Sequence, residues 1–408
     1  MRFLAFPVWF HAAAFAFSGM HNLINEIQTR QSTSETSQLI GDLVDGATTT
    51  VGRRVRDCIT GGTSCELQAR KDYERPGSLD SAICREDTCC VWDIVQQELT
   101  SHFRHDNGTC TSLARAAVRL GFHDAGSWST TSGTGGADGS LLLSSEEIER
   151  PENDGLQEIR SEALRILDRY SGHGVSAADL VQFMHNVATV ACPLGPRMLT
   201  LVGRKDSQES NPGDLIPSNN ATDASYLIEL FQNKTISPRD LAALLGAHTV
   251  ARQFYVDSTL AGQGLDSTPG VWDMNFYREM ALPNPPPGVF RLPSDTALSV
   301  ADGTAPRFEA FTDVTFGQTV WNAQYSSAYS CSARCSDFVS GAISNIDISV
   351  WRSATVTSDA QGHNSRAVSY GIVVYHVSLE HLSEYTPVDG NFSFETTVRY
   401  SEINGSVN

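Results

Sequence analysis

Arg119-Leu-Gly-Phe122-His123-Asp124 and Asp240-Leu-Ala-Ala-Leu-Leu-Gly-Ala-His248-Thr249 are the two stretches that decide the fold. Each places one histidine within an apolar pattern of helical period. In the first stretch Arg119 and His123 are four residues apart, so they share one face of a helix. In the second, His248 continues an apolar stripe that begins at Leu241 with i, i+3, i+4, i+7 spacing. We expect both imidazoles to point into one interior space.

A run of potential oxygen ligands follows each histidine. Gly136-Ala-Asp138-Gly-Ser140 follows the first, and Asp266-Ser-Thr268-Pro-Gly-Val271-Trp-Asp273 follows the second. Carboxylate, hydroxyl and carbonyl oxygens are the ligands that calcium prefers. A flexible glycine-rich turn is the alternative for the first run, and taken alone that alternative is the better one. Asp124 beside His123 and the matching offset of the second run favour two cation sites.

Helical signals with short polar connections dominate from Cys84 to about Val339. Ser176-Ala-Ala-Asp179 and Ser237-Pro238-Arg-Asp240 each place a hydroxyl at the N-cap and an acid three residues later, so both open helices. The chain has 408 residues, which suggests a core of roughly 250–300 residues with extensions. We predict a mainly α domain over residues 81–339, and the absence of an internal repeat argues against a solenoid or propeller.

The sequences at the two ends differ from this core in composition and in hydrophobic periodicity. Residues 1–20 place Arg2 ahead of an apolar stretch and then small residues, which predicts a cleaved secretory signal peptide. Ser, Thr, Gly and Asp follow with little apolar periodicity, so residues 21–80 are expected to be a flexible extension or propeptide. Strand-like runs such as 367–377 predict a β-rich C-terminal extension over residues 340–408. After residue 20, no segment has the roughly eighteen consecutive apolar residues that a membrane-spanning helix needs.

Charge and cysteine content indicate the compartment and exclude some partners. The formal net charge is −18, from 47 acidic and 29 basic residues, which disfavours binding to nucleic acid or acidic membranes. Nine cysteines fit an oxidising compartment, and an odd number leaves one without a partner. We expect a secreted, extracellular glycoprotein, with five Asn-x-Ser/Thr sequons that begin at Asn107, Asn220, Asn233, Asn391 and Asn404.

With these residues assembled, the chain resembles the secreted fungal class II haem peroxidases of the plant-type superfamily, over roughly Cys84 to Phe338. The resemblance implies the plant-type haem peroxidase fold, in which two helical subdomains enclose haem b. It implies an oxidoreductase that uses hydrogen peroxide to oxidise small phenolic or dye-like aromatic donors by one-electron steps through a ferryl haem intermediate. It also implies a monomer.

The resemblance assigns a role to each residue of the pocket. His248 matches the proximal ligand of the haem iron, and Asp295, in Leu292-Pro-Ser-Asp295, matches the aspartate bonded to its far nitrogen. The distal side matches Arg119, the aromatic residue Phe122, His123 and Asn153, the last in Pro151-Glu-Asn153-Asp-Gly. Such a histidine takes and returns the peroxide proton, while the arginine holds charge on the leaving oxygen. A lone buried histidine is more often a satisfied core residue, but these matched surroundings favour a ligand.

Two bound Ca²⁺ ions are also implied by the resemblance. The distal site matches Asp124, Gly136, Asp138 and Ser140. The proximal site matches Thr249, Asp266, Thr268, Val271 through its backbone carbonyl, and Asp273.

The chain departs from the best-known members of this group at their specialised sites. The three carboxylates that bind manganese in some members are replaced by Ser112, Ala116 and Phe254, which leaves no hard-ligand site for Mn²⁺. The surface tryptophan of lignin-type members is replaced by Ala243. Trp128, Trp272 or a surface tyrosine could relay electrons instead, although packing is the commoner role of such aromatic residues. We therefore expect a generic, low-redox type of peroxidase.

The cysteines match the family's pattern incompletely. By resemblance Cys110 pairs with Cys192, Cys84 pairs with Cys90, and Cys89 pairs with either Cys331 or Cys335. Cys58 and Cys65 would close a small further loop. One of the two late cysteines is then left over.

Two other functions compete with the enzymatic one. The chain could be a non-catalytic secreted calcium glycoprotein on a peroxidase scaffold, with the β-rich extension as a binding module. That alternative predicts no haem absorption, or a haem that does not turn over. A non-haem metal hydrolase built on His123, Asp124 and His248 is disfavoured, because close His-x-x-x-His spacing is absent.

Overall fold

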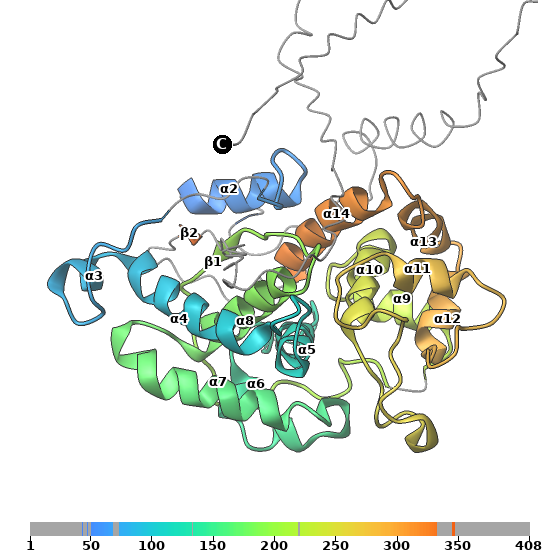
Figure 1. The fold of residues 1–408 in the computed structure, drawn as a ribbon, viewed down its shortest axis with the longest axis horizontal. Coiled ribbons are helices and arrows are strands. Elements are labelled where there is room, and N and C mark those ends of the chain that lie inside the picture. Colours follow the sequence, from blue (N-terminus) through green and yellow to red (C-terminus); the bar gives the residue numbers. More distant parts are fainter. Residues whose placement is uncertain are drawn as a thin grey trace, which may run out of the picture. The chain divides into compact units, whose positions relative to one another are not determined.

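Helices make up nearly all the regular structure in the computed structural model, which describes residues 43, 47, 50–67, 73–132, 134–218, 221–332 and 345–346. The prediction of a mainly α fold is confirmed (Figure 1). Every described residue belongs to one compact unit, residues 1–352. The predicted signal peptide and nearly all of the predicted C-terminal extension lie outside the described residues, so those domain boundaries stay predictions.

Two long helices, α5 (Ser112–Gly126) and α8 (Ala177–Ala191), pack along each other in the first half of the fold. Almost every residue of α8 is buried, so this helix forms the centre of the main hydrophobic core. As the sequence predicts, Ser176 caps α8 by accepting a hydrogen bond from the backbone N–H of Asp179. The other elements of this half are α2 (Thr50–Ile59), α3 (Ala82–Glu86), α4 (Thr88–Phe103), α6 (Ser140–Leu143), η3 (Glu147–Glu149), η4 (Pro151–Asn153), α7 (Gln157–Tyr170), η5 (Ser171–His173) and β1 (Thr200–Leu201).

The second half of the fold packs around α10 (Pro238–Leu245) and α14 (Gly317–Ser332). Ser237 caps α10 by accepting from the backbone N–H of Asp240, and Pro238 occupies the first turn, as predicted. β1 pairs antiparallel with β2 (Asn345–Ile346). The other elements are α9 (Ala224–Gln232), η6 (Gly246–Val250), η7 (Ser258–Leu260), α11 (Asn275–Met280), α12 (Pro293–Ser299) and α13 (Ala305–Phe311).

Part of the segment expected to be a flexible extension is a folded helix. α2 buries Val55 and Ile59 in a small cluster with Leu43 and Ala47, and the helix contacts α14. The sequence expectation missed it because only one narrow face of α2 is apolar, so its composition remains polar. Burial of that face against another helix stabilises a segment that propensity alone would not.

Three disulfides cross-link the described part of the chain. Cys58–Cys65, Cys84–Cys90 and Cys110–Cys192 are present, as predicted. Cys110–Cys192 joins residues 82 apart in sequence and thereby ties the start of α5 to the end of α8. The side chains of Cys331 and Cys335 lie outside the described residues, so the predicted pairing of Cys89 stays a prediction.

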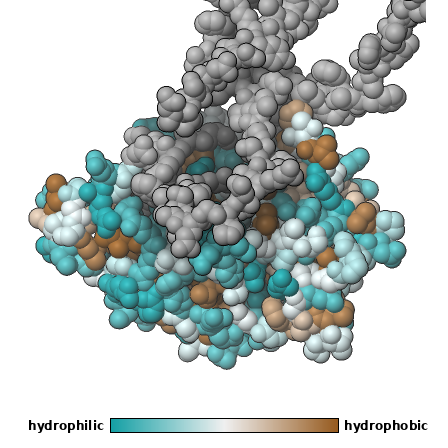
Figure 2. All heavy atoms as spheres, in the orientation of Figure 1, coloured by the Kyte–Doolittle hydropathy of each residue, from teal (hydrophilic) through white to brown (hydrophobic). Residues whose placement is uncertain are grey.

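The coloured face of the described part that Figure 2 shows is mainly polar. Figure 2 shows hydrophilic residues over most of the drawn face, with apolar residues in scattered groups. No helix within the described ranges is long and apolar enough to span a membrane.

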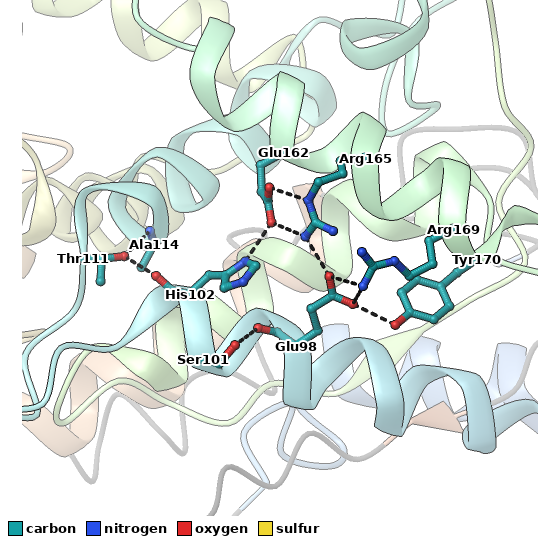
Figure 3. A network of polar contacts seen from close by, with 9 residues as sticks. All are labelled: Glu98, Ser101, His102, Thr111, Ala114, Glu162, Arg165, Arg169 and Tyr170. Carbon is teal, nitrogen blue, oxygen red and sulfur yellow. Dashed lines mark hydrogen bonds and ion pairs between the residues drawn. The ribbon is translucent and has the colours of Figure 1, made fainter. Parts of the chain in front are cut away.

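A charged network joins α4 to α7 (Figure 3). Glu98 accepts hydrogen bonds from Arg165 at 2.6 Å, from Arg169 at 3.0 Å and from the Tyr170 hydroxyl at 2.7 Å. Burial alone would raise the pKa of Glu98, but the hydrogen bonds from Tyr170 and Arg165 and the charges of both arginines lower it. The ionised carboxylate therefore stabilises the contact between the two helices.

Glu98→Gln is expected to lower the free energy of unfolding by about 1–2 kcal/mol, because charge-assisted hydrogen bonds at a partly exposed site are lost. Because folding lowers this pKa, the stabilisation is present above the ordinary glutamate pKa of about 4.3 and is lost as pH falls through the lower folded value. Urea unfolding at about pH 7 and about pH 3 measures it. Glu74→Gln, at an exposed glutamate, is the control; an equal loss in both variants, or a loss independent of pH, contradicts the prediction.

Candidate active site

A cavity of about 240 Å³ lies between the two halves of the fold and holds both predicted histidines in its wall. One water molecule needs only about 10–15 Å³, so the cavity is large enough for a sizeable ligand. His123 and Arg119 reach it from α5, and His248 reaches it from η6. The structure thus brings together the two stretches that the sequence singles out. Much of the remaining wall is apolar, with side chains that include Val118, Phe122, Phe231, Leu241, Leu244 and Leu298.

Hydrogen bonds fix the orientation and the tautomer of His123. Its Nδ1 lies 2.9 Å from Oδ1 of Asn153, and Arg119 Nε lies 3.2 Å from its Nε2. The Asn153 amide is oriented in turn, because its Nδ2 donates to the carbonyl of Glu147 at 2.7 Å. An amide oxygen can only accept, so Nδ1 carries the proton and Nε2 keeps its lone pair.

The electrostatic surroundings keep His123 neutral and Arg119 charged. Burial, with the nearby charge of Arg119, lowers the pKa of His123 to about 3. Burial also lowers the pKa of Arg119, to about 10, which leaves the guanidinium protonated at neutral pH. The guanidinium is held by the carbonyls of Asp154 and Glu152 at 2.6 and 2.7 Å. The site therefore pairs a neutral base with a fixed cation.

On the opposite wall, His248 is bonded to a buried carboxylate. Its Nδ1 lies 2.8 Å from Oδ2 of Asp295, which is 1% exposed. Burial acts to lower the pKa of His248, but the charge and hydrogen bond of Asp295 outweigh it, so the pKa is raised. The His248 side chain keeps 32% of its surface accessible, because it lines the cavity. Its Nε2 is thus available to a ligand.

His248 lies in a tight 3₁₀ turn rather than in the preceding α-helix, which ends at Leu245. Gly246 opens this turn beneath two aromatic rings. A Cβ atom there would lie 2.3 Å from the Tyr277 hydroxyl and 2.4 Å from the Trp321 indole. Only glycine lets these rings approach, so the turn that presents His248 is set by packing from α11 and α14.

The predicted distal oxygen ligands gather behind His123. Asp124 is fully buried, and its carboxylate accepts from the backbone N–H groups of Gly139 and Leu141. Asp138 Oδ1 accepts from the N–H of Ser140, whose own hydroxyl is buried and has no hydrogen-bond partner within the described residues. Burial and the charges of Asp138 and Glu147 raise the pKa of Asp124. The cluster is rich in negative charge and holds an unsatisfied hydroxyl, which suits a cation.

The predicted proximal oxygen ligands gather in the same way beside His248. Thr249 Oγ1 lies 2.5 Å from Asp266 Oδ2 and 3.4 Å from the carbonyl of Val271. Thr268 Oγ1 lies 3.1 Å from Asp273 Oδ1. Burial, with the charges of Asp273 and Glu279, raises the pKa of Asp266 to about 7. All five predicted residues therefore share one small volume.

No three His, Cys, Asp or Glu side chains within the described ranges are arranged as a metal site. Each oxygen cluster instead combines two carboxylates with neutral hydroxyl or carbonyl oxygens. This is a donor set for a hard cation and not for zinc. The non-haem hydrolase considered from the sequence accordingly finds no support in the geometry.

The structure also shows where the residues lie that replace the specialised sites of some peroxidases. Phe254 lines the cavity and is 51% exposed, beside Tyr255 at 57%. Ser112 is exposed at the start of α5. Ala243 is buried, and its carbonyl accepts a hydrogen bond from the Trp321 indole. No carboxylate stands at these positions, and Trp272 is fully buried.

Sequence reasoning missed several residues of the site. Tyr325 and Tyr329 of α14 line the cavity, and Glu147 places a third buried carboxylate near the distal cluster. The spacing of four between the tyrosines signals a shared helix face. Nothing local indicates which surface that face contacts, because α14 is about 200 residues from α5 in the chain.

Comparisons with known proteins agree with this geometry. The family described as "Peroxidase" matches residues 95–314. A protein named "Peroxidase" from Arthromyces ramosus is 33% identical over 289 residues, which cover 63% of this chain and 77% of that protein. Another "Peroxidase", from Coprinopsis cinerea, is 33% identical over 308 residues, 66% of this chain and 83% of its own. A "Low-redox potential peroxidase" from Taiwanofungus camphoratus is 32% identical over 242 residues, 55% and 68% of the two chains.

The helical fold, the cavity with a histidine on each wall and these comparisons together identify a haem-dependent oxidoreductase. The chain belongs to the peroxidase family, as a plant-type peroxidase of the fungal group. Its cofactor is haem and its oxidant is hydrogen peroxide. The cavity fits this cofactor, because its apolar wall suits a porphyrin and His248 offers an imidazole nitrogen for the iron.

Proposed function

We propose that this peroxidase is secreted and takes single electrons in turn from small phenolic or dye-like donors. The observation that carries the proposal is the unlike pair of imidazoles on one cavity. His123 is bonded to a neutral amide, and His248 is bonded to a carboxylate. Haem bound between them supplies the redox chemistry that amino-acid side chains lack.

His123 is the proton carrier in the proposed reaction. Its Nε2 is unprotonated, and its lone pair accepts a hydrogen bond from Arg119 Nε at the cavity wall, a bond that bound peroxide would replace. Peroxide bound there gives its proton to Nε2, and Nε2 then returns the proton to the departing oxygen. The Asn153 amide keeps the ring aligned throughout, because it holds Nδ1–H.

Arg119 and Asp295 supply fixed charges on either side. The Arg119 guanidinium stabilises negative charge that develops on the leaving oxygen, and it is already oriented by two carbonyls. Asp295 accepts the Nδ1–H of His248, which orients the ring and makes Nε2 a stronger donor to iron. Phe122 packs against Phe231 at 6.0 Å and helps to wall the cavity.

His123→Leu tests the proton-carrier role. The second-order rate of reaction with peroxide should fall by roughly 10²–10⁴-fold, because proton transfer is lost while the haem ligand remains. Stopped-flow absorbance in the haem band measures this rate, and the resting spectrum is the control for retained haem. A variant that binds haem and reacts as fast as the parent contradicts the assignment. A parent chain with no haem band would contradict the whole proposal.

The donor class follows from what stands at the cavity mouth. Phe254 and Tyr255 present aromatic surface there, and the positions that bind manganese in some relatives carry no carboxylate. Aromatic donors can stack on such a surface, whereas Mn²⁺ requires hard oxygen ligands.

Steady-state assays with three donors test this class. The enzyme should oxidise a simple phenol and show no saturable oxidation of Mn²⁺ or veratryl alcohol. Phe254→Asp restores one carboxylate and serves as a comparison, while Ser112→Ala leaves the phenol rate unchanged. Saturable Mn²⁺ oxidation by the parent would contradict the proposal.

We also propose that the two oxygen clusters hold one Ca²⁺ each. The distal site is formed by Asp124, Gly136, Asp138 and Ser140. The proximal site is formed by Thr249, Asp266, Thr268, Val271 and Asp273. The support is the burial of like charges together, with a Ser140 hydroxyl that lacks a partner among described residues. Each cluster lies directly after a cavity histidine, so bound Ca²⁺ would fix both walls.

Removal of calcium with a chelator should lower the melting temperature by about 3–5 °C per site, because a ligand at a hundredfold excess over Kd contributes about 2.7 kcal/mol and a domain of this size unfolds with a large entropy. Differential scanning calorimetry with added Ca²⁺ or Mg²⁺ measures the loss and its reversal. Asp138→Asn should reduce the effect, whereas the exposed Glu74→Gln should not. Melting that does not respond to chelation contradicts the calcium sites.

Secretion as a monomeric glycoprotein completes the proposal. Asn107 and Asn233 are exposed in the structure and so are open to glycosylation. The three disulfides fit an oxidising compartment.

A further inference from the structure

A tyrosine of the cavity wall is hydrogen-bonded to a buried histidine that the peroxide reaction does not use. Tyr325 of α14 lines the cavity and is 1% exposed. Its hydroxyl oxygen lies 3.1 Å from Nε2 of His185, which belongs to α8 and is fully buried. The two rings are parallel within 4°, with centroids 6.3 Å apart. A phenol and an imidazole thus meet in a place closed to bulk water.

The direction of this hydrogen bond is fixed by the other side of the imidazole. His185 Nδ1 lies 2.8 Å from the backbone carbonyl of Val118, which can only accept, so Nδ1 carries the proton. Nε2 is therefore the acceptor, and the Tyr325 hydroxyl donates to it. The imidazole is neutral, because burial lowers its pKa to about 3. The phenol proton already points at a base.

The neighbouring tyrosine lacks such a base. Tyr329 also lines the cavity, and its ring stacks on His185 at 3.6 Å. Its hydroxyl, however, donates to the amide oxygen of Gln182 at 2.7 Å. An amide oxygen does not take up a proton near neutral pH. The two tyrosines are thus matched in position and differ in their proton acceptor.

Space for this arrangement depends on a glycine in the first key stretch. A Cβ atom on Gly121 would lie 2.5 Å from the Tyr329 hydroxyl, 2.6 Å from His185 Cβ and 2.9 Å from His185 Nδ1. Real Cβ atoms do not approach heavy atoms so closely, so a side chain at this position would displace the imidazole. The absence of a side chain at Gly121 permits the Tyr325–His185 pair.

Two tryptophans extend the aromatic contact away from the cavity. Trp272 lies edge-on to Tyr325 at 4.7 Å, and it stacks on Trp321 at 5.1 Å with an interplanar angle of 2°. Their indole N–H groups donate to the side-chain oxygen of Asn322 and to the carbonyl of Ala243, neither of which is a base. An oxidised indole at either position would find no base to take its proton. An oxidised phenol at Tyr325 can shed its proton instead.

We propose that Tyr325 is an internal one-electron donor to the peroxide-oxidised haem, and that His185 accepts its phenolic proton. This inference rests on the proposed placement of haem in the cavity. One electron passes from Tyr325 to the cofactor, the O–H bond breaks, and an N–H bond forms at His185 Nε2. The products are a neutral tyrosyl radical and an imidazolium. An oxidised phenol is a strong acid, so even an imidazole weakened by burial can take the proton. An external donor returns the electron, and the proton moves back to Tyr325.

Rapid freeze-quench electron paramagnetic resonance on the holoenzyme tests the proposal, after one equivalent of peroxide and without a donor. The parent should give a tyrosyl signal whose hyperfine splitting collapses when the chain carries β-deuterated tyrosine. Tyr325→Phe should lose the signal while its haem band still responds to peroxide. Tyr329→Phe, on the same helix and the same cavity, should keep the signal.

His185→Phe separates the proton step from the electron step. The ring is retained but the base is lost, so the tyrosyl signal should disappear although Tyr325 remains. In D₂O the parent's signal should form more slowly, because the transferred proton is exchanged. The inference is overturned by a signal that persists in Tyr325→Phe, by its loss in Tyr329→Phe alone, or by a parent without a tyrosyl signal whose haem band responds to peroxide. A parent whose haem band does not respond overturns the proposed function instead.

Discussion

The site depends on the hydrogen bond that each cavity histidine makes through Nδ1. The partner is the Asn153 amide for His123 and the Asp295 carboxylate for His248. His123 and His248 are the same side chain on two walls of one cavity. Burial and the positive charge of Arg119 lower the pKa of His123 and keep this imidazole neutral, while Asn153 orients it without adding charge. Asp295 places a buried negative charge against His248 and increases its donor strength. The two roles that we propose, proton carrier for His123 and metal ligand for His248, thus follow from their hydrogen-bond partners and not from the histidines themselves.

This arrangement requires buried carboxylates. They lie in two clusters, one next to each cavity histidine. Asp124 and Asp138 share one cluster with nearby Glu147, and Asp266 and Asp273 share the other. Burial raises the pKa of each of these aspartates. Without a cation, like charges packed this way oppose folding. Calcium at both clusters would convert that repulsion into a constraint on the turns that carry His123 and His248.

Local patterns in the sequence were enough for the parts of the site that lie within one helix or one turn. Helical spacing placed Arg119 with His123, and capping residues located the starts of α8 and α10. The resemblance to the family is needed to assign Asn153 and Asp295, because each contacts its histidine only in the tertiary structure. The Tyr325–His185 contact joins residues 140 apart, and helix α2 is stabilised by packing. No local pattern reports such contacts, because each depends on two faces that meet only in the folded chain.

Helix α5 links the two proposed reactions, because its opposite faces hold different partners. One face presents Arg119 and His123 to the cavity. The other is fastened to α8, where His185 binds the carbonyl of Val118 and Gln182 donates to the carbonyl of Gly121. The proton acceptor proposed for Tyr325 is therefore also a support for the helix that carries the distal base. A larger residue at position 121 would disturb both at once, because its Cβ atom would collide with His185 and with the Tyr329 hydroxyl.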